Sequence, residues 1–328
     1  MKVLFIGGTG NISTASSRLA IEKGWDLYLL TRGKSLHIPK GAHILKADIN
    51  DLGKVKALLN DHYFDAVVNW VAFTPKDIDR DYELFKDKTA QYVFISSASC
   101  YQKPLSHPVI TESTPLANPF WDYSRQKIAC EDELMSLYRN KGFPITIVRP
   151  SLTYDTVIPV PIGGWTEYTI VDRIKKGKKI IIHGDGSSLW TITHARDFAI
   201  GFIGLLGHQQ AIGQSFHITS DEILTWNQIY EAVAMAAGKK AEMVYIPSDY
   251  LGTFDEQLKG SLLGDKAVST IFDNSKIRRF VPEFNPVIRF KDGIRETIHW
   301  FEQESNRMII KSETNEFMDR ILNAYKRP

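Results

Sequence analysis

The chain has 328 residues, of which 43% are hydrophobic and 24% charged, so its composition is that of a folded globular protein rather than a disordered or fibrous one. Its 40 basic and 38 acidic residues give a net charge of +2, which argues against a large basic field for capturing nucleic acid. Cys100 and Cys130 form neither a disulfide framework nor a metal-ligand spacing.

The first half of the chain alternates short apolar segments with helix-like ones. The apolar segments are continuous rather than alternating with polar residues, which is typical of parallel strands covered on both faces. We therefore predict an α/β fold with a Rossmann-like, doubly wound parallel sheet. The predicted strands lie at 2–6, 26–30, 66–70, 92–95 and 145–148, and the predicted helices at 11–23, 54–60, 76–86 and 123–138.

The rhythm changes after Arg149-Pro150. Short strands are predicted at 179–183, 215–218 and 243–246, mixed with helices at 226–237 and 293–304. This mixture predicts a smaller C-terminal α+β domain. We expect residues 1–155 to form the first domain, with 184–214 returning to it. Residues 156–183 and 215–328 would form mainly the second.

A glycine-rich turn follows the first predicted strand. It reads Gly7-Gly8-Thr9-Gly10-Asn11-Ile12-Ser13 and leads directly into a helix. Such a turn directs backbone N–H groups and a helix N-terminus toward a phosphate, so we predict that the first domain binds a dinucleotide through Gly7, Gly10, Asn11 and Ile12. The alternative is a purely structural turn.

The segment after the second strand bears on which dinucleotide binds. It reads Leu30-Thr31-Arg32-Gly33-Lys34 and lacks the carboxylate that usually accepts from a ribose 2′-hydroxyl. Thr31 and Arg32 would lie beside this ribose, and Arg32 would bind a 2′-phosphate through charge-assisted hydrogen bonds, which favours NADP over NAD. A solvated basic turn is the alternative, and it leaves NAD open.

Other strand ends complete the predicted cofactor site. Asp48 is placed to accept from an adenine amino group, although it would otherwise cap the next helix, a role for which Asp51 is better placed. Trp70 is predicted either to contact the cofactor or to belong to the core. The remaining predicted contacts at strand ends are Ile49, Val71, Ala72 and Pro150.

A serine, a tyrosine and a lysine form the predicted catalytic set. Tyr123 and Lys127 are four residues apart near the start of a helix, so they share one face, and a lysine ammonium there would lower the pKa of the phenol. Tyr123 would exchange a proton with a substrate alcohol or carbonyl, and Ser97 would hydrogen-bond the same oxygen. Ser99 is the alternative serine and a candidate substrate contact.

These residues together resemble the extended short-chain dehydrogenase/reductase superfamily, in its NAD-dependent epimerase/dehydratase branch. The resemblance covers most of the chain. It implies a nicotinamide cofactor, a catalytic Ser97, Tyr123 and Lys127, and a substrate cleft between two domains. It is carried by Gly7-Gly8-Thr9-Gly10, Asp48, the segment from Ile95 to Tyr101, Tyr123 with Lys127, Val148-Arg149-Pro150, Gly184-Asp185-Gly186, the segment from Phe272 to Lys276, and the segment from Phe290 to Arg295.

The chain departs from this family in three places. Trp190 stands where members that bind nucleotide sugars usually carry an arginine, which puts a diphosphate-linked sugar in doubt. Trp190 would either stack on a sugar ring or belong to the core. The segment between Ala72 and Tyr92 is shorter than the family norm, so a dimer is not assumed. This short segment and the Thr31-Arg32-Gly33-Lys34 turn resemble the atypical branch that includes chloroplast stem-loop RNA-binding proteins.

Two hypotheses follow. The first is an NAD(P)-dependent epimerase, dehydratase or reductase acting on a hydroxyl or keto group of a small sugar-like substrate. The second is a non-catalytic nucleotide-sensing or RNA-binding protein of the same fold.

Glu112 and Asp122 are candidates for an additional dehydratase acid or base. His183, His194 and His217 form no metal motif. With no signal-peptide pattern and no apolar run near the ~20 residues of a membrane span, we expect a cytoplasmic location.

Overall fold

The computed structural model describes residues 1–34 and 38–325, so the last three residues of the expected second domain lie outside the described residues. Its centre is a seven-stranded sheet in which all neighbouring strands are parallel, with the order β12-β7-β5-β4-β1-β2-β3. This confirms the predicted Rossmann-like sheet. The strands are β1 (Lys2–Ile6), β2 (Asp26–Thr31), β3 (His43–Lys46), β4 (Ala66–Asn69), β5 (Tyr92–Ile95), β7 (Ile145–Pro150) and β12 (Ser215–Ile218).

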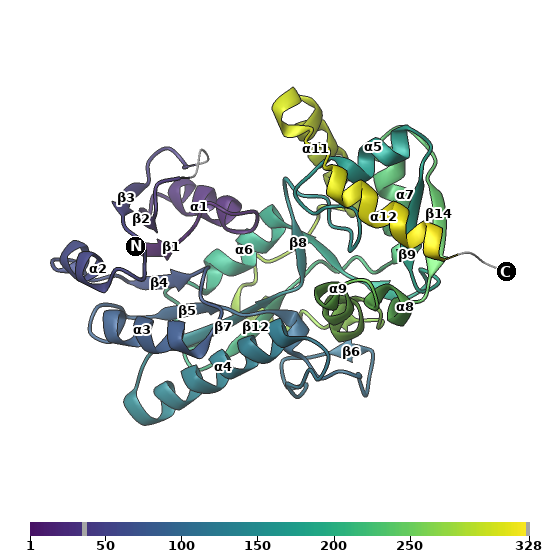
Figure 1. Cartoon of the computed structure of the whole chain (residues 1–328). Helices are drawn as coiled ribbons and strands as arrows, with labels where there is room; N and C mark the ends of the chain where they lie inside the picture. Colours follow the sequence, from purple (N-terminus) through teal and green to yellow (C-terminus); the bar gives the residue numbers. More distant parts are fainter. Residues whose placement is uncertain (35–37, 326–328) are drawn as a thin grey trace.

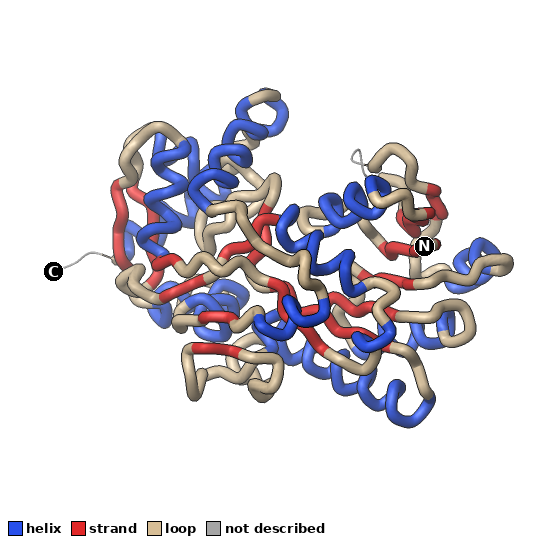
Figure 2. Tube along the Cα trace, turned by 180° about the vertical axis from the view of Figure 1, so that it is seen from behind, coloured by secondary structure: helices blue, strands red, loops and turns tan. Residues whose placement is uncertain are grey.

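Helices cover both faces of this sheet (Figures 1 and 2). Successive side chains of a strand point to opposite faces, so Val3 and Phe5 of β1 belong to one core cluster, and Leu4 and Ile6 to another. The first face is covered by α1 (Ser13–Glu22), α6 (Ala195–Leu205) and α10 (Ser275–Phe280). The second is covered by α2 (Leu52–Leu59), α3 (Pro75–Phe85) and α4 (Asp122–Lys141).

A second layer with its own core lies beyond the carboxyl ends of the strands, on the right in Figure 1. Its main helices are α5 (Thr169–Lys175), α7 (Trp226–Ala236), α11 (Phe290–Glu302) and α12 (Ser312–Ala324). Its paired strands include β9 (Lys179–His183) with β14 (Glu242–Ile246), and β10 (Leu189–Trp190) with β13 (Leu224–Thr225). The remaining short elements of the described chain, which belong to both parts, are β6 (Val109–Ile110) with β15 (Ile271–Phe272), β8 (Leu152–Tyr154) with β11 (Ile192–His194), α8 (Ser248–Gly252), α9 (Glu256–Ser261), a π-helical turn at Leu262–Lys266, and 3-10 turns at Ala98–Cys100, Gln209–Ala211 and Ser305–Arg307.

The division between the two parts differs from the expected one at Ser215–Ile218. The sequence placed this segment in the second domain, but it pairs with β7 as the edge strand of the central sheet. Helix α10 returns to the first part as well, through buried Ile277. A four-residue apolar strand carries no signal for the sheet it joins. The hydrophobic pattern of the sequence therefore could not predict its pairing with β7. No helix in the described ranges has the length and apolar character needed to cross a membrane.

Candidate active site and cofactor cavity

A cavity of about 550 Å³ opens where the carboxyl ends of β1, β4, β5 and β7 meet the start of α1. This is the edge at which doubly wound sheets bind their ligands. The cavity brings together segments that are far apart in the sequence. They are Gly7 to Ser13, Trp70, Val71, Phe73, Ile95, Ser96, Tyr123, Lys127, Pro150 to Thr153 and Trp165.

The glycine-rich turn has the backbone that a dinucleotide phosphate requires. Gly8 has φ = +86°, and a Cβ there would lie 2.7 Å from Leu29 Cδ2. Gly7 has φ = +96°, and its missing side chain keeps the backbone open beside Val71. Ser13 stands at the third glycine's place, where its Oγ accepts a 2.8 Å hydrogen bond from the Gly10 N–H. These residues fit a bound pyrophosphate at the N-terminus of α1.

The residues predicted around the adenosine ribose lie at the ends of β2 and β3, next to the cavity rather than in its lining. Arg32 is exposed and Thr31 half-buried. Asp48 is exposed, and its Oδ1 accepts a 3.0 Å hydrogen bond from the Asn50 N–H. Asp51 caps α2 by accepting from the Lys54 N–H at 3.2 Å, as expected.

The three residues that follow β4 have different surroundings. Trp70 packs against Phe5 and Phe202, with ring centroids 5.8 and 4.8 Å away, and also reaches the cavity. Val71 is 42% exposed and lines the cavity. Ala72 is buried, and its carbonyl oxygen accepts a hydrogen bond from Lys127.

Helix α4 presents Tyr123 and Lys127 to the cavity from its first two turns. The Lys127 ammonium donates hydrogen bonds of 2.7 Å to the Ala72 carbonyl and 2.8 Å to the Ile95 carbonyl. The Ile95 carbonyl is at the end of β5 and the Ala72 carbonyl lies beyond the end of β4, so Lys127 links these two segments at the cavity. Burial lowers the pKa of Lys127 to about 8.

The expected effect of Lys127 on the Tyr123 phenol is wrong for this structure. The pKa of Tyr123 is raised above its usual value, first by burial, while a hydrogen bond with Ser97 acts in the opposite direction. The Lys127 ammonium instead donates to two carbonyls and lies 5.9 Å from the Tyr123 ring centroid. The phenol is therefore a neutral proton donor at neutral pH.

Three serines surround the tyrosine in a connected set. Ser97 is half-buried and shares a 2.8 Å hydrogen bond with Ser99. Ser99 is 3% exposed and also accepts a 2.7 Å hydrogen bond from the Ser124 hydroxyl. Ser97 is thus the more accessible hydroxyl, and Ser99 holds it in place.

Trp190 lies in the core of the second part. It is 2% exposed and stacks on Trp226 with ring centroids 5.7 Å apart. Its ring is therefore covered by protein, and stacking on a sugar ring, one of the two roles considered for it, does not fit this position.

The other residues singled out from the sequence have local structural partners. Glu112 accepts a 3.2 Å hydrogen bond from the His217 N–H, and exposed Asp122 pairs with Arg125 on α4. His194 Nδ1 accepts from the Arg196 N–H at the start of α6. Within residues 1–34 and 38–325, His, Cys, Asp and Glu side chains form no group able to hold a metal ion.

Several lining residues were missed by sequence reasoning. Trp165 follows Gly163-Gly164 in the loop after β8 and reaches the cavity from the second part. Phe73 lies 6.4 Å from Tyr123 between ring centroids. The two glycines before Trp165 were a signal for a special backbone, but they gave no indication of which cavity the loop would enter.

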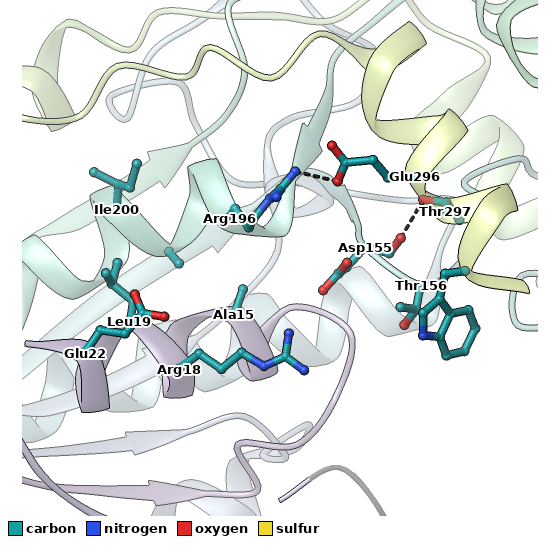
Figure 3. Close-up of a pocket in the computed structure, with 12 residues that line it drawn as sticks. Ala15, Arg18, Leu19, Glu22, Asp155, Thr156, Arg196, Ile200, Glu296 and Thr297 are labelled. Carbon is teal, nitrogen blue, oxygen red and sulfur yellow. Dashed lines mark hydrogen bonds and ion pairs between the residues drawn. The ribbon is translucent and has the colours of Figure 1, made fainter. Parts of the chain in front are cut away.

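A second cavity of about 530 Å³ lies on the other side of α1, between α6 and α11 (Figure 3). An ion pair of 2.6 Å between Arg196 and Glu296 joins the two parts across it, and the Thr297 hydroxyl donates to the Asp155 carbonyl. Burial raises the pKa of the Asp155 carboxyl. Because α1 and α6 of the first part and α11 of the second line it, this cavity marks the junction of the two parts, and neither Tyr123 nor Lys127 opens into it.

Residues 3–219 match the model of the NAD dependent epimerase/dehydratase family. The chain belongs to this family. The match spans the glycine-rich turn, the strand-end serines and the Tyr123 helix, so the segments that build the cavity are family segments.

Individual relatives have varied names. The chain is 29% identical over 266 residues to the chloroplast stem-loop binding protein of 41 kDa b of Arabidopsis thaliana, covering 76% of this chain and 67% of that protein. It is 22% identical over 292 residues to 2'-dehydrokanamycin reductase of Streptomyces kanamyceticus, covering 87% and 80%.

Solved structures with the same fold include the epimerase Mth375 of Methanothermobacter thermautotrophicus, with a TM-score of 0.77, 18% identity and 94% of both chains covered. The UDP-glucuronic acid 4-epimerase of Bacillus cereus, in complex with UDP-glucuronic acid and NAD, has a TM-score of 0.73 and 18% identity, covering 92% of this chain and 99% of that one. At these identities the likeness shows the fold.

Proposed function

We propose that this protein is an NAD(P)-dependent oxidoreductase of the epimerase, dehydratase or reductase type, acting on a hydroxyl or keto group of a sugar-like substrate. Ser97, Tyr123 and Lys127 are its proposed catalytic residues. The observation that carries this proposal is the opening of Tyr123 and Lys127 into the same cavity as the glycine-rich turn.

The chain's own groups support binding of the dinucleotide. The N-terminus of α1, with Asn11 and Ile12, would hold the pyrophosphate, and Val71 and Pro150 would contact the rest of the cofactor from two strand ends. When bound, the nicotinamide supplies or accepts the hydride. Lys127 would hold a ribose hydroxyl from below while keeping its hydrogen bonds to the strand ends.

Proton transfer falls to Tyr123. In the reducing direction its neutral phenol donates a proton to the carbonyl oxygen as that oxygen gains charge, and in the oxidising direction the phenolate takes it back. Ser97 donates a hydrogen bond to the same oxygen, and Ser99 with Ser124 keeps Ser97 oriented. Trp121 and Phe73 pack beside Tyr123.

We further propose NADP as the preferred cofactor. Arg32 is exposed at the end of β2, where we expect the adenosine ribose to bind, and its guanidinium suits a 2′-phosphate. NAD is the alternative, as in the family's name.

The first experiment denatures freshly purified protein, identifies any released nucleotide by mass, and titrates the emptied protein with NADP, NADPH, NAD and NADH. We expect weak, exchangeable NADP(H), which supports a reductase or dehydrogenase. Tightly retained NAD(H) would support an epimerase or dehydratase that recycles its hydride and would overturn the NADP preference. Binding of no dinucleotide would overturn the enzyme proposal.

The catalytic assignment is tested by NADPH oxidation with a panel of keto sugars. Tyr123→Phe removes the proton donor and should lower turnover by about 100-fold or more while leaving NADPH affinity within about threefold. Tyr63→Phe is the matched control, because Tyr63 is 56% exposed and lies outside the cavity. Unchanged turnover in Tyr123→Phe would end the assignment.

A non-catalytic RNA-binding protein is the second candidate, favoured by the name of the Arabidopsis relative. The net charge of +2 weighs against it. Salt-sensitive binding to a structured RNA hairpin that is unaffected by Tyr123→Phe, together with no dinucleotide binding, would make it the better interpretation.

A further inference from the structure

A third cavity, of about 510 Å³, has Trp121 in its lining and lies close to the catalytic cavity. The Trp121 and Tyr123 rings lie 4.9 Å apart between centroids, so the wall of this cavity is next to the proposed proton donor. The loop after β8 forms a second shared wall, because Gly163 and Gly164 line this cavity while Trp165 lines the catalytic one. A substrate bound at Tyr123 and extending past Trp121 would enter it.

The lining combines flat apolar surfaces with uncharged hydrogen-bonding groups. Trp121 and Phe317 supply aromatic rings, and the side chains of Gln257, Ser261 and Thr314 supply an amide and two hydroxyls. A sugar ring presents apolar C–H faces and a rim of hydroxyl groups, so this combination suits a sugar unit.

The two charged side chains that line this cavity are both acidic, although Lys266 lies over the Trp121 ring and Arg320 over the Phe317 ring, each 5.3 Å from the ring centroid. Asp255 and Glu313 line it, and no lysine or arginine does so in the part of the chain that the structure describes. Asp255 is oriented by accepting a 2.6 Å hydrogen bond from the Leu258 N–H at the start of α9. Glu313 lies in the first turn of α12. The two lining carboxylates favour an ammonium over a phosphate in this cavity.

Two buried polar atoms lie beside this cavity without hydrogen-bond partners among the described residues. Trp121 Nε1 is buried and has no hydrogen-bond partner among the described residues. Glu167 is 3% exposed, and its Oε2 is likewise without a hydrogen bond, although the Lys311 ammonium lies 3.6 Å away. The Glu167 carboxylate lies between two lining residues, against Gly164 and accepting from the Thr314 hydroxyl.

We propose that this cavity is a second sugar subsite that takes an amino-bearing sugar unit and rejects phosphate. The proposal rests on the proposed function, because it places the reacting sugar at Tyr123 and a second unit beyond Trp121. The substrate class is then an amino-bearing oligosaccharide or glycoside rather than a nucleotide sugar. The burial of Trp190 is consistent with this substrate class. Trp190 stands where a diphosphate would need a guanidinium, and its apolar ring is covered by protein.

The test compares three probes by ligand-observed NMR at pH 6, with NADPH present. They are a β-1,4-linked glucosamine disaccharide, cellobiose as its uncharged equivalent, and UDP-glucose. Two favourable carboxylate contacts should make the charged disaccharide bind about tenfold more tightly than cellobiose. UDP-glucose should bind more weakly than either.

Variants locate the effect. Glu313→Gln and Asp255→Asn each remove one charge, and asparagine also keeps a hydrogen-bond acceptor at the start of α9. Each should reduce the preference for the charged disaccharide by about threefold. Glu316→Gln is the control, because Glu316 is exposed on the same helix but does not line the cavity.

The outcomes separate this inference from the proposed function. Equal binding of cellobiose, tighter binding of UDP-glucose, an equal effect of Glu316→Gln, or dinucleotide binding without any disaccharide binding would overturn the subsite. Disaccharide binding that follows the variants, without dinucleotide binding, would support the subsite and overturn the proposed enzyme.

Discussion

The Lys127 ammonium donates a 2.7 Å hydrogen bond to the Ala72 carbonyl oxygen, just beyond strand β4. A second hydrogen bond, to Ile95 at the end of β5, makes this buried lysine a link between two strands as well as a cavity residue. Its charge is therefore coupled both to the shape of the sheet edge and to any anion bound above it.

We expect the affinity for NADPH to depend on the Lys127 proton. Burial lowers its pKa to about 8, although nearby Cys130, Cys100, Glu131 and Asp77 act in the opposite direction. Below that pH the charged ammonium attracts the cofactor, and above it the neutral amine does so less. Affinity measured by isothermal titration calorimetry should fall about tenfold from pH 7 to about pH 9.5. In Lys127→Arg the charge persists over this pH range, so NADPH affinity should no longer fall. If the affinity of this variant still falls with a midpoint near pH 8, another group is responsible.

Two buried histidines predict loss of stability in acid. Burial lowers the pKa of His183 and of His194 to about 4, from a value of about 6.5 in the unfolded chain. The unfolded state takes up these protons first, so the stability they contribute is complete above about pH 6.5 and is lost as the pH falls toward 4, by about 3 kcal/mol for each histidine.

Urea unfolding at a series of pH values measures this slope. His194→Asn should flatten it, because asparagine still accepts at the start of α6 but does not titrate. His299→Asn is the control, since His299 is exposed on α11. An unchanged slope in His194→Asn would show that other groups control the acid transition.

The buried ion pair of Glu131 and Arg149 should be costly to break from one side. Their side chains are 3% and 6% exposed, and Arg149 Nε donates to both Glu131 oxygens at 2.9 and 3.2 Å. Glu131→Gln leaves the guanidinium buried without its counter-charge and should lower the free energy of unfolding by about 3 to 5 kcal/mol.

The double variant Glu131→Gln/Arg149→Met should recover part of that loss, because the orphaned charge is also removed. Glu256→Gln, in an exposed pair with Lys259, is the control and should cost less than about 1 kcal/mol. If the loss of unfolding free energy in the double variant equals the sum of the losses in Glu131→Gln and Arg149→Met, the two side chains are not coupled.

A pair of glycine substitutions separates backbone strain from crowding. Gly8 and Gly24 have φ of +86° and +73°, but a Cβ at Gly8 meets Leu29 while one at Gly24 meets nothing within 4 Å. Gly24→Ala should cost about 1 kcal/mol and Gly8→Ala about 2 to 4 kcal/mol by urea unfolding. Equal losses would mean that Leu29 moves aside freely.

Arg32 should control the choice of cofactor. Arg32→Ala should weaken NADPH binding by about tenfold or more and NADH binding by less than about twofold, because NADH lacks the 2′-phosphate. Arg125→Ala, on α4 away from the ribose, is the control. Equal weakening of both cofactors would assign Arg32 to general electrostatic attraction.

The sequence was most informative where chemistry and periodicity coincide. The continuous apolar strands predicted a sheet buried on both faces, and the four-residue spacing of Tyr123 and Lys127 predicted two residues on one face of α4. Both features depend on local repeats, which a single sequence displays.

Contacts between residues that are far apart in the sequence could not be predicted from it. Whether Trp190 contacted substrate or core depended on Trp226, 36 residues later, and the raised pKa of Tyr123 depended on how deeply the folded chain buries the phenol. The entry of Trp165 into the catalytic cavity depends on how the loop after β8 folds across the first part. Such contacts are set by packing geometry, which has no sequence period.

Strand β12 also determines when the first part can be completed during synthesis. Its pairing with β7 and the packing of Phe198 and Phe202 from α6 bring residues beyond 195 into a core that begins at Val3. A chain released at residue 155 would keep α1 on the first sheet face but lack α6 and α10, leaving apolar surface uncovered there and the β7 edge unpaired, both of which favour aggregation. The nucleotide-binding layer thus stays unfinished until most of the polypeptide has emerged from the ribosome, and separate expression of the two halves is disfavoured.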